Sequence, residues 1–325
     1  MKTSPKFLTP LIIIGLLIAA YFFVDGMLFD GVKPRPVKDH GFQATYFAKE
    51  KTKSQPTVIV MGGGQWGDYW GQEFAKTGYS GLSLPYFGQE GLPKYMENIP
   101  LEYFGKAIDW LAKQPEVDPK NIIVMGASRN AELALVVASY YPESVHGAIA
   151  FAPSVVSWSN TVMPHSTNKI LPSWTFAGKP VSYAPMERIT GGDSDTIQTL
   201  PYWSNHLRFT AAVNKTAIPV QNINGPILML SGKDDQVWPS AMMSDMIEQR
   251  LEESEFKFEV SNVQYENAGH MISGNPYHPA DQRHGVMPVG DKEYVYLFGG
   301  TAEGDHAAQV DAGKRVMEYL RGLGE

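Results

Sequence analysis

The segment Asn121–Tyr141, NIIVMGASRNAELALVVASYY, carries the clearest indication of the fold in this chain. An apolar run, Ile122–Met125, leads into a polar corner, Gly126–Asn130, and a helix-like segment follows, Ala131–Tyr141. A strand, a sharp turn and a helix with a serine at the apex form the layout of a nucleophile elbow. In such a turn the hydroxyl of Ser128 stands clear of the sheet, where it is able to meet a carbonyl group.

The turn departs from its usual pattern, G-x-S-x-G, because Asn130 occupies the last glycine position. Asparagine tolerates unusual backbone angles better than most residues, so the turn remains possible although it is more crowded. We therefore predict that glycine would be tolerated at position 130. A serine before a helix is also a common N-cap, so this motif alone does not separate a nucleophile from a structural cap.

Composition narrows the function classes. The length of 325 residues suits one large α/β domain or two small ones. A net charge of −7 without a long basic run argues against nucleic acid as a partner. The chain has no cysteine, which excludes disulfides, a thiolate nucleophile and cysteine-ligated metal. We predict neither a cofactor nor a metal.

The N-terminal segment is predicted to be separate from the main domain. Lys2 and Lys6 precede an apolar run, Leu11–Val24, whose length falls between a signal-peptide core and a membrane span. Because no small-x-small cleavage site stands out, we predict that residues 1–28 are an uncleaved membrane anchor, with a removed signal as the alternative. Residues 29–40 are predicted to be a linker. A short N-terminal tail usually stays inside, which would put the main domain on the extracytoplasmic side.

Residues 41–325 alternate apolar strands with helical patterns, which predicts an α/β fold with a doubly wound, mostly parallel and right-handed sheet. The predicted strands are Thr57–Met61, Gly81–Tyr86, Ile122–Met125, Gly147–Phe151, Pro226–Leu230 and Lys257–Tyr265, with Phe42–Phe47 as a candidate edge strand. This alternation of strand and helix patterns is absent between residues 154 and 222. The segment carries Trp158, Trp174 and Trp203. We predict an ordered cap over the active site there. The alternative is a peripheral subdomain whose tryptophans form its own core.

Three further motifs each follow a predicted strand. Gly62–Gly64 is either a flexible turn or a loop whose backbone N–H groups, from Gly63 or Gly64, contact a developing oxyanion. Asp234 and Asp235 follow a late strand, and His270 follows the last one. Serine, acid and histidine in this order are typical of α/β hydrolases. The spacing alone does not distinguish the two aspartates.

If the chain is a hydrolase, each of these residue types has a defined chemical role. Ser128 attacks a carbonyl carbon, His270 takes and returns its proton, and one aspartate orients the imidazole. The backbone N–H of Arg129 is predicted to join that of Gly63 or Gly64 in stabilising the oxyanion. Only His270, among the eight histidines, has the strand–loop context of the base.

From about Gly41 to its C-terminus the chain resembles the catalytic domain shared by acyl-CoA thioesterases and bile acid-CoA:amino acid N-acyltransferases. The resemblance implies Ser128 as nucleophile, Asp235 as acid and His270 as base. Acyltransferase members look to carry cysteine as nucleophile, so Ser128 favours hydrolysis. The matching segments are Leu84–Gly88, Gly91–Lys94, Ile99–Phe104, Ala107–Leu111, Gly126–Arg129, Ser231–Asp235 with Trp238, Gly269–His270 and Gly299–Thr301.

The leading hypothesis is a serine hydrolase that cleaves an acyl ester or thioester, a small-molecule substrate. Trp158, Trp174 and Trp203 are predicted to line an apolar pocket for the acyl group. An acyltransferase, in which an amine or alcohol replaces water, is the second enzyme hypothesis. A non-catalytic binding protein with the same fold is the third, because Asn130 departs from the elbow pattern.

Overall fold

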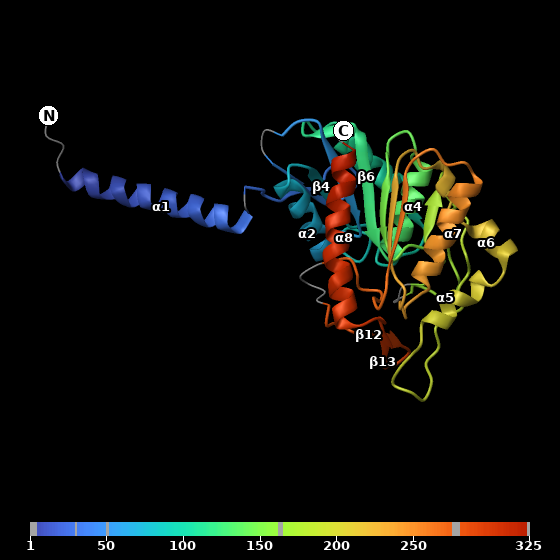
Figure 1. The fold of residues 1–325 in the computed structure, drawn as a ribbon. Helices are drawn as coiled ribbons and strands as arrows, with labels where there is room; N and C mark the ends of the chain where they lie inside the picture. The colour runs from blue at the N-terminus through green and yellow to red at the C-terminus, as the bar shows by residue number, and fades with distance from the viewer. Residues whose placement is uncertain (1–4, 30, 50–51, 162–164, 275–279, 324–325) are drawn as a thin grey trace.

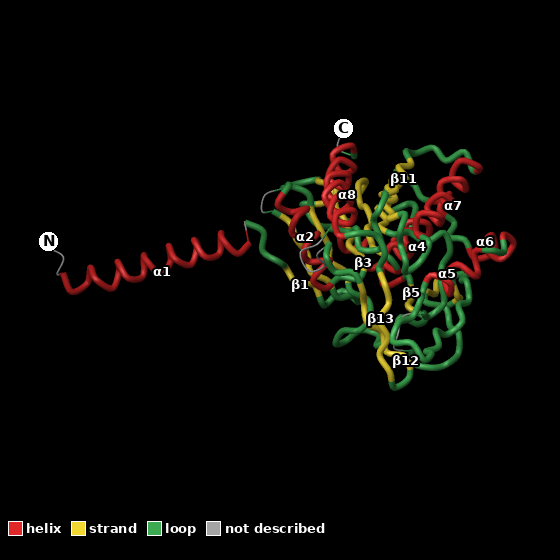
Figure 2. Tube along the Cα trace, turned by 60° about the horizontal axis from the view of Figure 1, so that its bottom comes forward, coloured by secondary structure: helices red, strands yellow, loops and turns green. Residues whose placement is uncertain are grey.

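An eight-stranded sheet lies at the centre of the structure, a computed structural model that describes residues 5–29, 31–49, 52–161, 165–274 and 280–323 (Figures 1 and 2). Its strands are β1 Arg35–Val37, β2 Ala44–Ala48, β3 Gln55–Met61, β4 Ser80–Leu84, β6 Val117–Ala127, β7 Ala148–Phe151, β10 Ile227–Gly232 and β11 Val260–Tyr265. Their spatial order is β1-β2-β4-β3-β6-β7-β10-β11. The β1–β2 and β2–β4 pairs are antiparallel and the others are parallel. The predicted α/β fold with a mostly parallel sheet is confirmed.

Helices cover both faces of this sheet (Figure 1). One face packs against α3, α4 and α7, and the other packs against α2 and α8. The bounds are α2 Gly64–Lys76, α3 Glu102–Leu111, α4 Arg129–Tyr140, α7 Ser240–Glu253 and α8 Ala302–Gly322. Strands between two helical layers have no solvent-facing side, so the central part of the sheet is built mostly from apolar runs.

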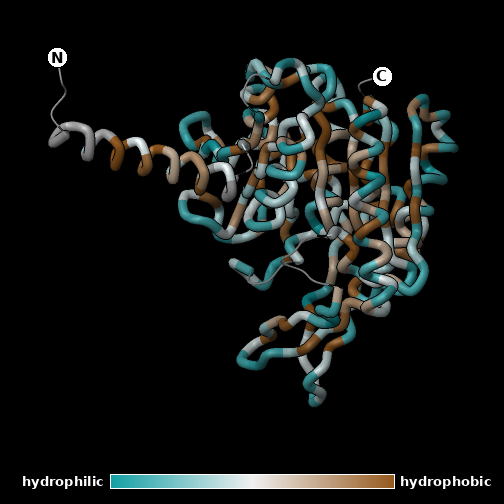
Figure 3. The backbone as a smooth tube through the Cα atoms, turned by 60° about the vertical axis from the view of Figure 1, so that its left-hand side comes forward, coloured by the Kyte–Doolittle hydropathy of each residue, from teal (hydrophilic) through white to brown (hydrophobic). Residues whose placement is uncertain are grey.

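Strand β3 illustrates this double burial. Its side chains alternate between the faces, with Ile59 and Met61 in one core and Val58 and Val60 in the other. All four are fully buried. The hydropathy-coloured trace accordingly shows the hydrophobic strands enclosed by helices of mixed character (Figure 3). This rigid sheet carries the candidate site at the carboxyl ends of its strands.

Three strands differ from the sequence-based expectations. Arg35–Val37, within the predicted linker 29–40, pairs with β2 and forms the edge of the sheet. A hairpin of β12, His284–Val289, and β13, Lys292–Leu297, was not predicted. Its two-residue turn, Gly290–Asp291, is a hairpin signal that the sequence does contain.

Helix α1, Pro5–Phe29, projects away from the other elements (Figures 1 and 2). Across the parts of the chain that the structure describes, no helix combines the length and the apolar character needed to cross a membrane. The predicted N-terminal anchor in residues 1–28, the membrane as a partner and the extracytoplasmic placement of the main domain are therefore wrong. As a helix, the apolar run Leu11–Val24 covers about 21 Å, less than the roughly 30 Å of a bilayer's hydrocarbon core.

The segment 154–222 packs onto the main domain through its buried tryptophans. Trp158 and Trp174 belong to the same core as α4. A small separate sheet joins β5, Ile99–Pro100, to the segment. That this segment caps an active site stays a prediction. Its described elements are β8 Trp174–Phe176, β9 Lys179–Pro180, α5 Leu200–Leu207, α6 Thr210–Thr216 and the 3-10 helix η1 Val220–Asn222.

Candidate active site

Ser128 sits at the sharp turn between β6 and α4. Its backbone angles, φ 57° and ψ −125°, are rare for a residue with a side chain, and such strain is typical of functional turns. Its backbone N–H donates to the carbonyl of Phe151 at 2.9 Å, which fixes the turn to β7. A methyl group on Gly126 would lie 2.0 Å from the carbonyl oxygen of Asn130, so only glycine permits this close approach of strand and helix.

His270 lies between Ser128 and Asp235. Its Nε2 is 2.9 Å from Ser128 Oγ, and its Nδ1 is 2.8 Å from Asp235 Oδ2. A neutral imidazole in this setting donates from Nδ1 to the carboxylate and accepts the serine hydroxyl proton at Nε2. The structure thus brings together three residues that were selected from the sequence by their positions after strands. Their joint action in catalysis stays a prediction.

The two adjacent aspartates have different surroundings. Asp234 is exposed, whereas Asp235 is buried. Asp235 Oδ1 accepts from the backbone N–H of Val237 at 2.9 Å, and Oδ2 accepts from Ser240 Oγ at 2.7 Å. These bonds leave the carboxylate aimed at His270. Of the two aspartates, Asp235 is therefore the one that contacts His270, and its role as the acid stays a prediction.

The loop that carries His270 is held by residues that the sequence analysis missed. Asp305 is fully buried and accepts from the backbone N–H of Gly269 at 2.7 Å. Arg283 forms an ion pair with Asp305 and donates to the carbonyl of Gly299. Burial raises the pKa of Asp305, while the bond from Gly269 and the charge of Arg283 lower it. Helix α8 and the β12–β13 region thus buttress the histidine loop from outside the nearby sequence.

The predicted oxyanion donors lie at the first turns of two helices. Arg129 is the first residue of α4, and Gly63 and Gly64 are the N-cap and first residue of α2. The first N–H groups of a helix have no acceptor within it and are available to a ligand. A methyl group on Gly62 would lie 2.3 Å from Asn130 Nδ2, so the glycine turn directly adjoins the elbow. Their role toward an oxyanion stays a prediction.

A buried ion pair lies one helical turn beyond Ser128. The guanidinium of Arg129 pairs with the carboxylate of Glu132, and both side chains are buried. Arg129 also donates to Ser173 Oγ at 2.6 Å, and Glu132 accepts from Trp174 Nε1 at 2.8 Å. Burial raises the pKa of Glu132, while Arg129 and its hydrogen-bond donors lower it. The i, i+3 spacing of these two residues is the sequence signal that was overlooked.

The three tryptophans occupy different positions. Trp158 and Trp203 have ring centroids 5.0 Å apart, Trp203 and Trp238 5.1 Å, and Trp238 and His270 5.9 Å. Trp203 is thus one aromatic ring away from the histidine. Trp158 and Trp174 have no exposed surface, whereas Trp203 is 8% exposed. Other side chains therefore cover Trp158 and Trp174 completely. The role of the three tryptophans in lining an acyl pocket stays a prediction.

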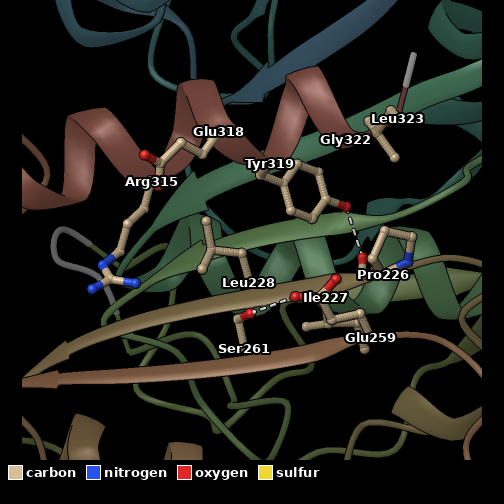
Figure 4. A pocket seen from close by; sticks show the side chains of 10 residues that line it. All are labelled: Pro226, Ile227, Leu228, Glu259, Ser261, Arg315, Glu318, Tyr319, Gly322 and Leu323. Atoms are coloured by element: carbon tan, nitrogen blue, oxygen red, sulfur yellow. Dashed lines mark hydrogen bonds between the residues drawn. The ribbon is translucent and has the colours of Figure 1, made fainter. Parts of the chain in front are cut away.

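A surface cavity of about 290 Å³ opens at the other end of β10 (Figure 4). Pro226 and Ile227, at the amino end of that strand, contribute to its lining, whereas Asp235 follows the carboxyl end. In this cavity the hydroxyl of Tyr319 donates to the carbonyl of Pro226 at 2.7 Å. The cavity is therefore separate from the Ser128 site. Among the described residues, no group of three histidine or carboxylate side chains is arranged to hold a metal ion.

A strained serine after β6, a carboxylate after β10 and a histidine after β11 on a mostly parallel sheet define an α/β-hydrolase fold. Solved structures with this fold bear out the assignment. A dienelactone hydrolase-like promiscuous phosphotriesterase from metagenomic libraries superposes with a TM-score of 0.53 at 12% identity, over 90% of this chain and 99% of that one. A putative dienelactone hydrolase from Klebsiella pneumoniae gives 0.53 at 15% identity, over 89% and 98%.

The chain belongs to the family described as BAAT / acyl-CoA thioester hydrolase C terminal, which matches residues 99–323. Human acyl-coenzyme A thioesterase 6 is 27% identical over 293 residues, 89% of this chain and 65% of that protein. Mouse mitochondrial acyl-coenzyme A thioesterase 2 is 28% identical over 295 residues, 89% and 60% respectively. The mouse peroxisomal succinyl-coenzyme A thioesterase is 25% identical, over 89% and 65%. The chain therefore spans 60% to 65% of the length of these relatives.

Proposed function

We propose that this protein is a serine hydrolase that cleaves acyl thioesters, with Ser128 as nucleophile, His270 as general base and acid, and Asp235 as the group that orients the imidazole. The observation that carries the proposal is the continuous hydrogen bonding from Ser128 Oγ through both ring nitrogens of His270 to Asp235. The names of the relatives, acyl-coenzyme A thioesterases, support a thioester as the substrate class.

The chemistry proceeds in two halves. Ser128 Oγ attacks the acyl carbon while His270 Nε2 takes the hydroxyl proton, and the carbonyl oxygen becomes an oxyanion near the N–H groups of Arg129 and Gly63 or Gly64. The carbon–sulfur bond then breaks, and His270 returns the proton to the leaving thiolate. Water next attacks the acyl-serine with His270 as base. The proton passes back to Ser128 as the carboxylic acid leaves.

Asp235 stabilises the imidazolium that forms in each half. Its bonds from Ser240 Oγ and the backbone N–H of Val237 hold the carboxylate in place beside the imidazole. For the acyl group we propose a site beside Trp203, the least buried tryptophan of the ring series that reaches His270. In this arrangement Trp158 and Trp174, which are fully buried, belong to the core beneath that site.

The test is a substrate panel with formation of the free acid as the common readout and thiol release as a second readout for the thioesters. Acyl-CoA thioesters of short, medium and long chains are compared with matched oxygen esters, for the wild type and Ser128→Ala. A fluorophosphonate probe, with the labelled residue identified by peptide mass analysis, reports the nucleophile independently of the substrate choice. We expect thioester hydrolysis and labelling at Ser128, both lost in Ser128→Ala. A folded wild type that neither turns over any substrate nor reacts with the probe is a binding protein instead.

Acyl transfer is the second candidate, because the family's description pairs BAAT with the thioester hydrolases. The same panel separates the two reactions when amines such as glycine or taurine are added. Transfer consumes the thioester and forms an amide, whereas hydrolysis forms the free acid. A serine nucleophile favours hydrolysis, so we expect the free acid to dominate at every amine concentration.

A further inference from the structure

Asn130 occupies a position where the elbow pattern calls for glycine, and its side chain makes specific contacts. Its Oδ1 accepts a hydrogen bond of 2.8 Å from the hydroxyl of Tyr86. Its Nδ2 lies against Gly62, where even a methyl group would approach to 2.3 Å. The asparagine therefore bridges a residue that follows β4 and the turn that follows β3.

Tyr86 is a rigid anchor for this bridge. It is 1% exposed, and its ring packs at centroid distances of 5.5 Å against both Phe104 and Trp174. Burial raises the pKa of Tyr86, so its hydroxyl stays protonated and acts as a donor. A donor in such surroundings needs an acceptor, because an unsatisfied buried hydroxyl is destabilising. Asn130 Oδ1 supplies this acceptor.

The glycine turn is confined on its other side by the same segment. A methyl group on Gly63 would lie 2.5 Å from the backbone nitrogen of Pro85, the residue before Tyr86. The carbonyl of Pro85 accepts from the hydroxyl of Tyr103 at 2.6 Å, which fixes this segment to α3. The N–H of Gly62 donates to the carbonyl of Leu84 at 3.0 Å. The turn thus lies between Pro85 and the Asn130 side chain.

We propose that Asn130, locked by its hydrogen bond with Tyr86, is a positioning residue that sets the place of the Gly62–Gly64 turn and hence of its oxyanion donors relative to Ser128. This inference rests on the proposed function. It reverses the expectation that glycine would be tolerated at position 130. Glycine would remove the side chain against which the turn packs and the 2.8 Å acceptor of Tyr86, leaving its hydroxyl only the distant sulfur of Met96 at 4.0 Å.

The role predicts a loss in kcat rather than in KM, since the oxyanion exists only in the transition state. Tyr86→Phe removes one hydroxyl and keeps the ring packing. We expect it to lower kcat about tenfold with little change in KM, the effect of one misplaced hydrogen bond. Asn130→Gly should lower kcat by at least as much. The double variant should be no slower than Asn130→Gly, because both changes break the same contact.

The matched control is Tyr319→Phe. This change also removes one tyrosine hydroxyl that donates to an acceptor inside the fold, the Pro226 carbonyl, but at the far end of β10 (Figure 4). Urea unfolding measures the loss of stability in each variant. We expect Tyr319→Phe to lose stability as Tyr86→Phe does while its kcat stays at the wild-type value.

The rate of fluorophosphonate labelling of Ser128 is a second readout, because the probe's tetrahedral adduct also needs the oxyanion donors. Labelling rates and kcat within about twofold of wild type in both Tyr86→Phe and Asn130→Gly would overturn the inference. Additive losses in the double variant would also overturn it, as would an equal kcat loss in Tyr319→Phe. A wild type that is neither active nor labelled overturns the proposed function itself, and this inference with it.

Discussion

Trp174 Nε1 donates a 2.8 Å hydrogen bond to Glu132 Oε1, which joins the 154–222 segment to the helix that follows Ser128. Glu132 accepts in addition from the backbone N–H of Trp158 at 3.0 Å and is paired with Arg129. The carboxylate is fully buried. One side chain of α4 thus organises both the back of the elbow and the tryptophans of the neighbouring segment.

Removing the charge of Glu132 should destabilise the protein strongly. In Glu132→Gln the guanidinium of Arg129 stays buried without a counter-charge, and we expect a loss of about 3–5 kcal/mol in the free energy of unfolding. The double variant Arg129→Met/Glu132→Gln should be more stable than Glu132→Gln alone, because it buries no unpaired charge. Urea unfolding provides both values.

The matched control for this ion pair is the exposed Lys314–Glu318 pair, whose charged atoms lie 3.6 Å apart on α8. We expect Glu318→Gln to change stability by no more than about 1 kcal/mol. A double variant less stable than Glu132→Gln would contradict the account, because it would mean that the hydrogen bonds of Arg129 matter more than its charge.

The two adjacent aspartates offer a sharp test of the acid. Asp235→Asn should reduce kcat by roughly 10⁴-fold or more, because residues of a Ser-His-Asp set act as a unit. Asp234→Asn, at the exposed neighbour, should leave kcat almost unchanged. Steady-state thioester hydrolysis with circular dichroism as the folding check measures both. A large loss of kcat in Asp234→Asn beside a small loss in Asp235→Asn would mean that Asp234, and not Asp235, is the acid.

Variants of Trp203 and Trp174 should have different effects, because Trp203 keeps a small exposed surface and Trp174 has none. Trp203→Ala should raise KM for long-chain thioesters about tenfold more than for short ones, since only a long chain reaches the lost surface. Trp174→Phe should instead lower stability through the lost bond to Glu132 and leave the chain-length profile parallel to wild type. A dependence of KM on chain length that stays parallel to the wild type in Trp203→Ala would show that Trp203 does not contact the acyl group.

Two partly buried histidines should make stability fall in mild acid. Burial lowers the pKa of His146 and of His206 below the ordinary value. Above that value, about 6.5, both are neutral in folded and unfolded chains and have no effect. As the pH falls below it, the unfolded chain binds protons that the folded chain resists, so stability decreases until the lowered folded pKa is passed. Each histidine contributes a slope of at most about 1.4 kcal/mol per pH unit.

Urea unfolding at about pH 7.5 and about pH 5.5 measures this slope in the wild type and in His206→Gln. The variant should lose less stability between the two values, because glutamine keeps a polar contact to Thr216 and binds no proton. His146→Gln should behave likewise, as Nδ1 of His146 is buried and has no hydrogen-bond partner among the described residues. Slopes equal to that of the wild type in both variants would trace the acid sensitivity to other groups.

Local sequence patterns determined the fold class and the candidate serine. The strand, turn and helix around Ser128 are encoded within about twenty residues, and the other strands are short apolar runs that suit burial on both faces. The order of serine, acid and histidine after successive strands also selected His270, because the carboxyl ends of parallel strands meet at one edge of a sheet. These inferences needed only periodicity and chain order.

The tertiary structure decided what depends on contacts between distant residues. Ser128 and His270 are 142 positions apart, and only the packed sheet brings their side chains to 2.9 Å. Asp235 differs from Asp234 in burial and in its partners, properties that two neighbours in a strand-end loop do not reveal by spacing. The contact of Asn130 with Tyr86 likewise joins separate strand ends. Apolar composition suggested a membrane span, but spanning also requires a long enough helical run, and no described helix has both properties.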